Sequence, residues 1–265
     1  MEIQAAILLV IVFFLMLAFS VPVSYSIIVS ALVTIVAFLT PGFGVFVSAQ
    51  KMVSGIDSFS LIAVPFFILA GLLMNSGGIA KRLINLALLV LGKVPGSLAL
   101  TNIAGNAMFG SISGSGIAAA TAIGGVMLPL EKEQKYDEGF AAAVNIATSP
   151  VGQLAACCMV VAFFYARKQG YVIKRDKLTA KIVGKTIWDA IPSLFLVVII
   201  IGGILSGKFT PTEASGVAVA YAFILSVFIY RTIKLSEIPK LLVDAAVMTT
   251  IVMLIIGASS VLSFV

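Results

Sequence analysis

The chain has 265 residues, of which 61% are hydrophobic and 11% are charged, and its formal net charge at pH 7 is +6. A soluble domain carries about 25% charged residues, so the composition excludes an ordinary soluble protein and predicts an all-α, polytopic membrane protein. The sequence contains no histidine, which excludes histidine-based zinc sites and catalytic triads. Most of its basic residues flank apolar runs, which is the pattern of cytoplasmic loops in membrane proteins, so the positive net charge does not indicate a nucleic acid partner.

The N-terminal part contains two predicted membrane spans, at 3–19 and 21–39, and the second one ends where Pro41 and Gly42 would break a helix. The segment 44–55 is mildly amphipathic and predicts an interfacial helix or a loop helix. We therefore expect residues 1–57 to form an N-terminal scaffold.

The segment 58–77 is apolar and has Pro65 near its middle. Its 20 residues are enough either for one kinked span or for a helical hairpin that enters and leaves the membrane on the same side. We favour the re-entrant hairpin, with its tip at Pro65, Phe66 and Phe67, as the opening of a first repeat over 58–166.

The segment 96–129 is apolar, but its centre, Gly110–Gly116, is a run of glycine and serine around one isoleucine. Glycine weakens a helix by about 1 kcal/mol relative to alanine, and serine competes for backbone hydrogen bonds. The run predicts an interrupted transmembrane helix, which is how secondary transporters build ion and substrate sites near the membrane midplane. A small-residue face for close helix packing explains the same residues equally well.

Charged segments suggest the orientation of the chain in the membrane. Residues 131–138 carry four acids and two lysines and are predicted to be external. Residues 167–185 carry seven basic residues and one acid, which predicts a cytoplasmic loop over 167–188. These two segments are thus expected on opposite sides, joined by an apolar run at 140–166.

The remaining residues, 189–265, resemble the start of a second repeat. Two apolar runs are joined by a turn around Pro211, and the last run, 245–265, contains another small polar patch. Proline turns at Pro65 and Pro211 give the two halves of the sequence a weak similarity to each other. This similarity predicts an incomplete inverted repeat.

Four motifs, taken together, match a known family. They are Val64–Gly71 (VPFFILAG), Ser113–Gly116 (SGSG), Tyr165–Tyr171 (YARKQGY) and Thr210–Ala214 (TPTEA), and they occur in this order. The chain therefore resembles the large membrane subunit of tripartite ATP-independent periplasmic (TRAP) transporters, the DctM type.

The resemblance implies an elevator-like permease that imports organic acid anions, such as a C4-dicarboxylate, sialic acid or a related carboxylate, with sodium as the coupling ion. It implies a small membrane subunit and a periplasmic substrate-binding protein as partners, and a multi-pass location in the bilayer of a bacterial or archaeal inner membrane. It implies neither an enzyme nor a cofactor beyond sodium, and no nucleic acid partner.

The sequence also departs from the family. After Leu154 family members continue with an Ile-Pro-Pro-Ser-like turn and a further span, a block that is absent here, and they extend past the region of Val265. The alternative function is therefore a degenerate or partial, non-transporting membrane scaffold of the same family. An intramembrane enzyme is the least supported reading, because no histidine and no acid pair lies within a span.

The candidate ion- and substrate-binding residues follow from the resemblance. Neutral oxygens of Ser113 and Ser115, with backbone carbonyls, would coordinate sodium, a hard cation. The full candidate set is Asn106, Ser111, Ser113, Gly114, Ser115, Gly116 and Thr121. The hairpin and turn motifs are Pro65, Phe66, Phe67, Thr210, Pro211, Thr212 and Glu213, of which Glu213 is expected either to cap the following helix or to contact the site.

Overall fold

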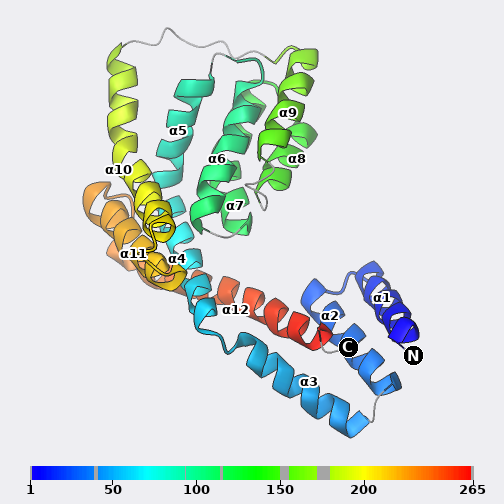
Figure 1. Cartoon of the computed structure of the whole chain (residues 1–265). Coiled ribbons are helices and arrows are strands. Elements are labelled where there is room, and N and C mark those ends of the chain that lie inside the picture. The colour runs from blue at the N-terminus through cyan, green and yellow to red at the C-terminus, as the bar shows by residue number, and fades with distance from the viewer. Residues whose placement is uncertain are drawn as a thin grey trace. The chain divides into compact units, whose positions relative to one another are not determined.

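The computed structural model describes residues 2–38, 41–92, 94–113, 116–149, 155–171 and 180–263. Every regular element in these ranges is helical, which confirms the predicted all-α class. The chain divides into two compact units, residues 1–62 with 246–265 and residues 63–245 (Figure 1).

The first unit is built from apolar helices of the N-terminal segment and the C-terminal part of α12. Its elements are α1 (Glu2–Ala18), α2 (Val23–Phe38), α3 (Pro41–Ile56), a 3-10 turn (Phe59–Ile62) and the part of α12 (Ile238–Leu262) that follows Ala245. A small core forms around Ala31, Ile35 and Val261. Helix α3 approaches α12 closely at Gly55, because a Cβ at that position would overlap the side chain of Ser260.

The second unit holds the larger core. Its elements are α4 (Ala63–Ser76), α5 (Ile79–Leu91), α6 (Ser97–Ser113), α7 (Gly116–Glu133), α8 (Glu138–Thr148), α9 (Ala155–Gln169), α10 (Ala180–Leu205), α11 (Pro211–Phe223), a π-helix (Ile224–Ile229), a 3-10 turn (Leu235–Glu237) and the start of α12. The predicted loop over 167–188 is thus shorter than expected, because α10 already begins at Ala180.

The predicted hairpin turn at Pro65 is wrong. Pro65 is the third residue of α4, and the helix continues through Phe66 and Phe67 to Ser76. Proline is tolerated in the first turn of a helix, where its missing N–H would have no intrahelical partner. The chain turns instead at Gly77 and Gly78, and α4 and α5 meet there at a bend of 68°.

The turn between α4 and α5 is held by the π-helix that follows α11 and by the residues just after it. Ser226, in the π-helix, donates a hydrogen bond to the carbonyl oxygen of Leu73 (3.2 Å). Thr232 donates to the carbonyl oxygen of Gly77 (2.8 Å), and the Arg82 guanidinium lies 3.5 Å from the centre of the Tyr230 ring. These contacts join residues far apart in the sequence and fix where the bend lies.

Helices α6 and α7, and then α8 and α9, form two hairpins that open at the same end of the unit (Figure 1). The amide of Gly96, just before α6, donates to the carbonyl oxygen of Tyr171, just after α9 (2.9 Å). The ring of Tyr171 stacks on that of Tyr136, between α7 and α8, with centroids 4.2 Å apart. We call this region, residues 131–138 with 165–171, the charged end.

The prediction that 131–138 and 167–185 face opposite sides is therefore wrong for the described part of the second segment. Tyr136 and Tyr171 are in direct contact. The run 140–166 is not one span, because α8 has 11 residues and α9 has 15, each shorter than the ~20 that a crossing helix needs. Helix α8 instead leads away from the charged end, and α9 returns to it.

This geometry makes a topology prediction. Single cysteines at Lys135 and at Lys168, in a background with alanine at Cys157 and Cys158, should react with a membrane-impermeant maleimide from the same side of the membrane. Intact cells and inside-out vesicles provide the two orientations. Labelling of Lys135Cys and Lys168Cys from opposite sides would contradict the hairpin arrangement.

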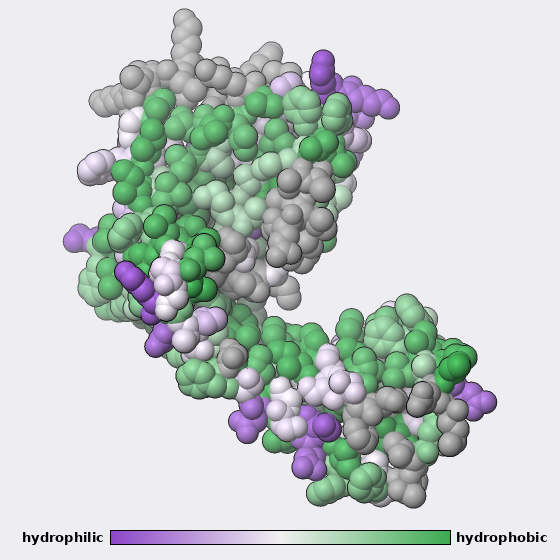
Figure 2. All heavy atoms as spheres, in the orientation of Figure 1, coloured by the Kyte–Doolittle hydropathy of each residue, from purple (hydrophilic) through white to green (hydrophobic). Residues whose placement is uncertain are grey.

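Among the described residues, three helical segments are long and apolar enough to cross a bilayer: Val183–Leu205, Pro211–Ile229 and Leu235–Leu262. The bent pair of α4 and α5 makes a fourth if it counts as one span, and α1 and α2 are shorter apolar helices. Figure 2 shows hydrophobic residues over most of the visible sides of the helices. The chain is thus a multi-pass membrane protein, as the composition predicts.

The two units do not follow the four segments expected from the sequence. The first boundary falls after Ile62, close to the expected 57. Residues 246–265, however, group with the N-terminal segment and not with the rest of 189–265, because the end of α12 packs on α2 and α3.

Candidate functional site

A row of buried polar side chains runs along one face of α6. Asn102 and Asn106 are one turn apart, and both are fully buried. The Asn106 Nδ2 donates to the side-chain oxygen of Asn102 (2.8 Å) and to its backbone oxygen (3.1 Å). The Asn102 Nδ2 in turn donates to both carboxylate oxygens of Glu131 on α7, at 3.2 and 3.4 Å.

Helix α8 supplies the other side of this network. Asn145 Oδ1 and Thr148 Oγ1 accept hydrogen bonds from the Asn106 Nδ2, at 3.0 and 3.2 Å. Thr148 donates its own proton to the carbonyl oxygen of Val144 (2.7 Å). Four oxygens therefore surround one amide nitrogen, whereas the buried Asn106 Oδ1 has no hydrogen-bond partner among the described residues.

A glycine lets α8 approach α7 within the network. Asn145 Nδ2 donates to the carbonyl oxygen of Ala120 on α7 (3.0 Å). A Cβ on Gly124 would overlap Asn145, whereas a Cβ on the next residue, Gly125, would meet nothing within 4 Å. The two adjacent glycines therefore provide a matched pair for substitution.

Gly124→Ala is expected to displace Asn145 and lower the free energy of unfolding by about 1–3 kcal/mol, since buried hydrogen bonds are lost. Gly125→Ala should instead raise it by up to about 1 kcal/mol through helix propensity. Denaturant unfolding in detergent would measure both. Equal effects of the two substitutions would contradict the close approach at Gly124.

The hairpins meet where each of them turns. An ideal Cβ on Gly110, near the end of α6, would lie 3.4 Å from the carbonyl oxygen of Ser149, just after α8. The C-terminal ends of α6 and α8 carry partial negative charge, and the N-terminal ends of α7 and α9, at Gly116 and Ala155, carry partial positive charge. The C-terminal ends therefore favour a bound cation, and the N-terminal ends favour a bound anion.

The structure places the predicted site residues at and beside this meeting point. Asn106 is the centre of the buried network. Ser111 and Ser113 belong to the last turn of α6, Gly116 begins α7, and Thr121 lies in its second turn. Helix α6 continues to Ser113, so the interruption is shorter than the predicted run Gly110–Gly116; Gly114 and Ser115 lie outside the described residues.

The two turn motifs take no part in the network. Pro65, Phe66 and Phe67 lie in α4. Thr210 is the N-cap of α11, Pro211 and Thr212 follow in its first turn, and Glu213 completes a capping box. The Glu213 carboxylate accepts from the Thr210 amide (2.8 Å) and hydroxyl (2.9 Å), which decides for the capping role.

Sequence reasoning missed Asn102, Glu131, Asn145 and Thr148. The available signals were the spacing of the asparagines, four residues apart in an apolar helix, and the spacing of Asn145 and Thr148, three apart. Glu131 carried no signal of its own, because it begins a run whose other charged side chains are exposed.

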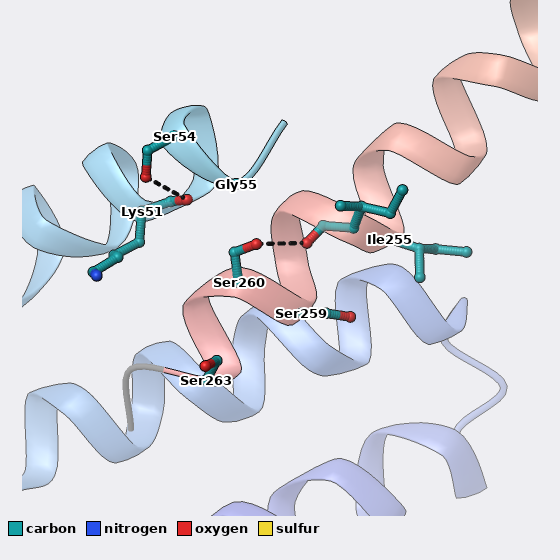
Figure 3. Close-up of a pocket in the computed structure, with 8 residues that line it drawn as sticks. Lys51, Ser54, Gly55, Ile255, Ser259, Ser260 and Ser263 are labelled. Carbon is teal, nitrogen blue, oxygen red and sulfur yellow. Dashed lines mark hydrogen bonds between the residues drawn. The ribbon is translucent and has the colours of Figure 1, made fainter. Parts of the chain in front are cut away.

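The first unit contains a polar pocket of about 480 Å³ between α3 and α12. Figure 3 shows that the side chain of Lys51 extends away from Ser260. The hydroxyls of Ser54 and Ser260 donate to carbonyl oxygens of their own helices, of Lys51 (3.2 Å) and Ile256 (3.0 Å). The hydroxyl protons of these two serines are therefore used within their own helices.

Comparison of the sequence with known proteins identifies the family of the chain. The sequence matches the description "Tripartite ATP-independent periplasmic transporter, DctM component" over residues 10–155 and 154–265. The chain belongs to the DctM family. The two matched stretches overlap at residues 154–155.

Several proteins are similar to this DctM-family chain. The protein YgiK of Salmonella typhimurium is 39% identical over 93% of the chain and 64% of its own length. The sialic acid TRAP transporter large permease protein SiaM of Vibrio cholerae is 35% identical, over 89% and 62%. The C4-dicarboxylate TRAP transporter large permease protein DctM of Rhodobacter capsulatus is 32% identical, over 82% and 59%. The chain thus spans less than two thirds of the length of these relatives.

Proposed function

We propose that the chain acts as the large permease subunit of a sodium-coupled TRAP importer of organic acid anions. Its partners would be a small membrane subunit and a periplasmic substrate-binding protein, and its location a prokaryotic inner membrane. The observation that carries the proposal is the family match over nearly the whole chain, with relatives whose names describe sialic acid, C4-dicarboxylate and 2,3-diketo-L-gulonate permeases.

The meeting of the hairpins supports the proposal chemically. Sodium prefers oxygen ligands, and the carbonyl oxygen of Ser149, just after α8, lies close to Gly110 near the end of α6. Asn106 and Thr148 are hydrogen-bonded beside this point. Ser113 closes α6 at this point, and Ser115 follows in the sequence. The N-terminal ends of α7 and α9 would favour the carboxylate of an organic anion at the same depth.

Uptake measurements test the transport function. Cells that lack their own TRAP systems would express the chain with the small subunit and binding protein of the sialic acid, C4-dicarboxylate or diketogulonate system. Uptake of one labelled anion is expected in sodium buffer and not in potassium buffer. A well-expressed, membrane-inserted chain that imports none of these anions would favour the non-transporting scaffold.

Sodium binding can be tested without transport. Sodium chloride should raise the melting temperature of the purified chain relative to choline chloride, because a ligand that binds the folded state stabilises it. Replacing both Gly114 and Ser115 with alanine should remove most of this shift. The control, alanine at Gly202 and Ser206 in α10 and the turn after it, should keep the shift, and an unchanged shift in the Gly114/Ser115 variant would contradict the proposed ligands.

A further inference from the structure

Glu131 is a fully buried carboxylate without a cationic partner in the described part of the chain. It lies in the last turn of α7, past the apolar run, at the charged end of the hairpins. Its neighbours in the sequence behave differently: Lys132 forms an ion pair with Glu138 at 2.8 Å, and both of those side chains are about 70% exposed. Burial of Glu131 is therefore specific to this side chain.

The elements packed on α7 bring almost no charge to Glu131. Helices α4 and α6 contain no ionisable side chain, and the acid of α8, Glu138, is paired with Lys132. On α5 the cations are Lys81, which is exposed, and Arg82, which is engaged by Gly78 and the Tyr230 ring. After α7, Tyr136 is the titratable group that senses the Glu131 charge.

This environment favours the neutral acid. Burial raises the pKa of the Glu131 carboxyl to about 7, and the hydrogen bond from Asn102 opposes that shift. Both protonation states are therefore populated near neutral pH. The charge state then matters to Asn102, whose Nδ2 is directed at the carboxylate.

The hydrogen bonds form a chain with one direction. Asn106 donates to Asn102, and Asn102 donates to Glu131, so both amides point their nitrogens toward the acid. This direction leaves the Asn106 Oδ1, at the far end of the chain, without a partner among the described residues. An ionised Glu131 accounts for this direction, because a carboxylate can only accept.

We propose that Glu131 is a proton-binding site whose occupancy sets the direction of hydrogen bonding along Asn102 and Asn106. One proton from water at the charged end binds a carboxylate oxygen, and no other covalent bond changes. The new hydroxyl donates to the Asn102 Oδ1 once that amide has turned over. The Asn102 Nδ2 then donates to the Asn106 Oδ1 once the Asn106 amide has turned over as well, which gives up the hydrogen bonds of the Asn106 Nδ2 to Asn145 and Thr148.

Infrared difference spectroscopy of the purified full chain tests proton binding directly. The probe is the pH itself, and the readout is the C=O stretch of a protonated carboxyl group. The wild-type chain should show such a band with a midpoint near pH 7, and Glu131→Gln should remove it. Glu133→Gln, at an exposed position in the same turn, should keep it, and Asn102→Ala should move the midpoint to higher pH because the stabilising donor is lost.

Nuclear magnetic resonance of ¹⁵N-asparagine-labelled protein tests the hydrogen-bond chain. The side-chain signals of Asn102 and Asn106 should shift with the midpoint of the carboxyl band, and that of the exposed Asn85 should not. A neutral-pH band that Glu131→Gln leaves intact, or the absence of such a band, would overturn the proposal. If Glu131→Gln does not fold, an unmoved midpoint in Asn102→Ala would overturn it as well, because that variant retains Glu131.

Discussion

Asn106→Leu is expected to be strongly destabilising, lowering the free energy of unfolding by about 2–6 kcal/mol. Leucine is similar in size, so the packing of α6 is kept, but the oxygens of Asn102 and Asn145 lose their donor while they remain buried. Each unsatisfied buried polar group costs about 1–3 kcal/mol. Unfolding of the purified chain by denaturant in detergent micelles would measure the change.

Asn85→Leu provides the control for this substitution. Asn85 lies on the exposed face of α5, and surface substitutions usually change stability by less than about 0.5 kcal/mol. An Asn106→Leu variant as stable as the Asn85→Leu variant would show that the amide network contributes nothing to the folded state.

The stability of the chain should fall as the pH rises from about 4.5 toward 7, through the Glu131 titration. The folded-state pKa of about 7 lies above the ordinary value of 4.5, so folding binds a proton in this interval. The stabilisation is complete below the unfolded-state pKa and is lost as the pH passes the folded-state pKa. The loss amounts to about 3 kcal/mol at 1.36 kcal/mol per pKa unit.

The comparison of two variants isolates this contribution. The difference in unfolding free energy between wild type and Glu131→Gln should depend on pH over this interval, because the other titrating groups cancel. The corresponding difference for Glu133→Gln should stay flat. A flat difference for Glu131→Gln would mean that the buried carboxylate has the same pKa in the folded and unfolded chains.

Composition and the glycine-serine run were sufficient to predict the membrane class and the place of the helix break. The apolar content leaves no soluble alternative, and a break between Ser113 and Gly116 follows from residues that form helices poorly. The kind of break was harder to predict, since an interrupted span and a hairpin have the same local sequence. Tertiary contacts decide between them, and the deciding residue, Tyr171, lies 35 positions after Tyr136.

The error at Pro65 has a different cause. A proline inside an apolar run signals a helix break, but only if the helix has already begun several residues earlier. Here α4 begins at Ala63, so the same residue lies where proline is well tolerated. The start of α4 depends on how the preceding turn packs, and periodicity does not report that.

The polar network was only partly predictable. Asn106 was identified because it flanks the break, whereas Asn145 and Glu131 enter the site through packing of α8 and α7 against α6. Glu131 is 29 positions from Asn102, and Asn145 is 39 positions from Asn106, so no local sequence pattern links these partners.

The hydrogen bond between Gly96 and Tyr171 means that the peptide enters and leaves the α6–α9 block at a single point. A segment with adjacent ends can be exchanged as a cassette, since the remainder of the chain needs to span almost no gap when it is replaced. Residues 96–171 could therefore be swapped for the corresponding part of a relative with one pair of splice junctions.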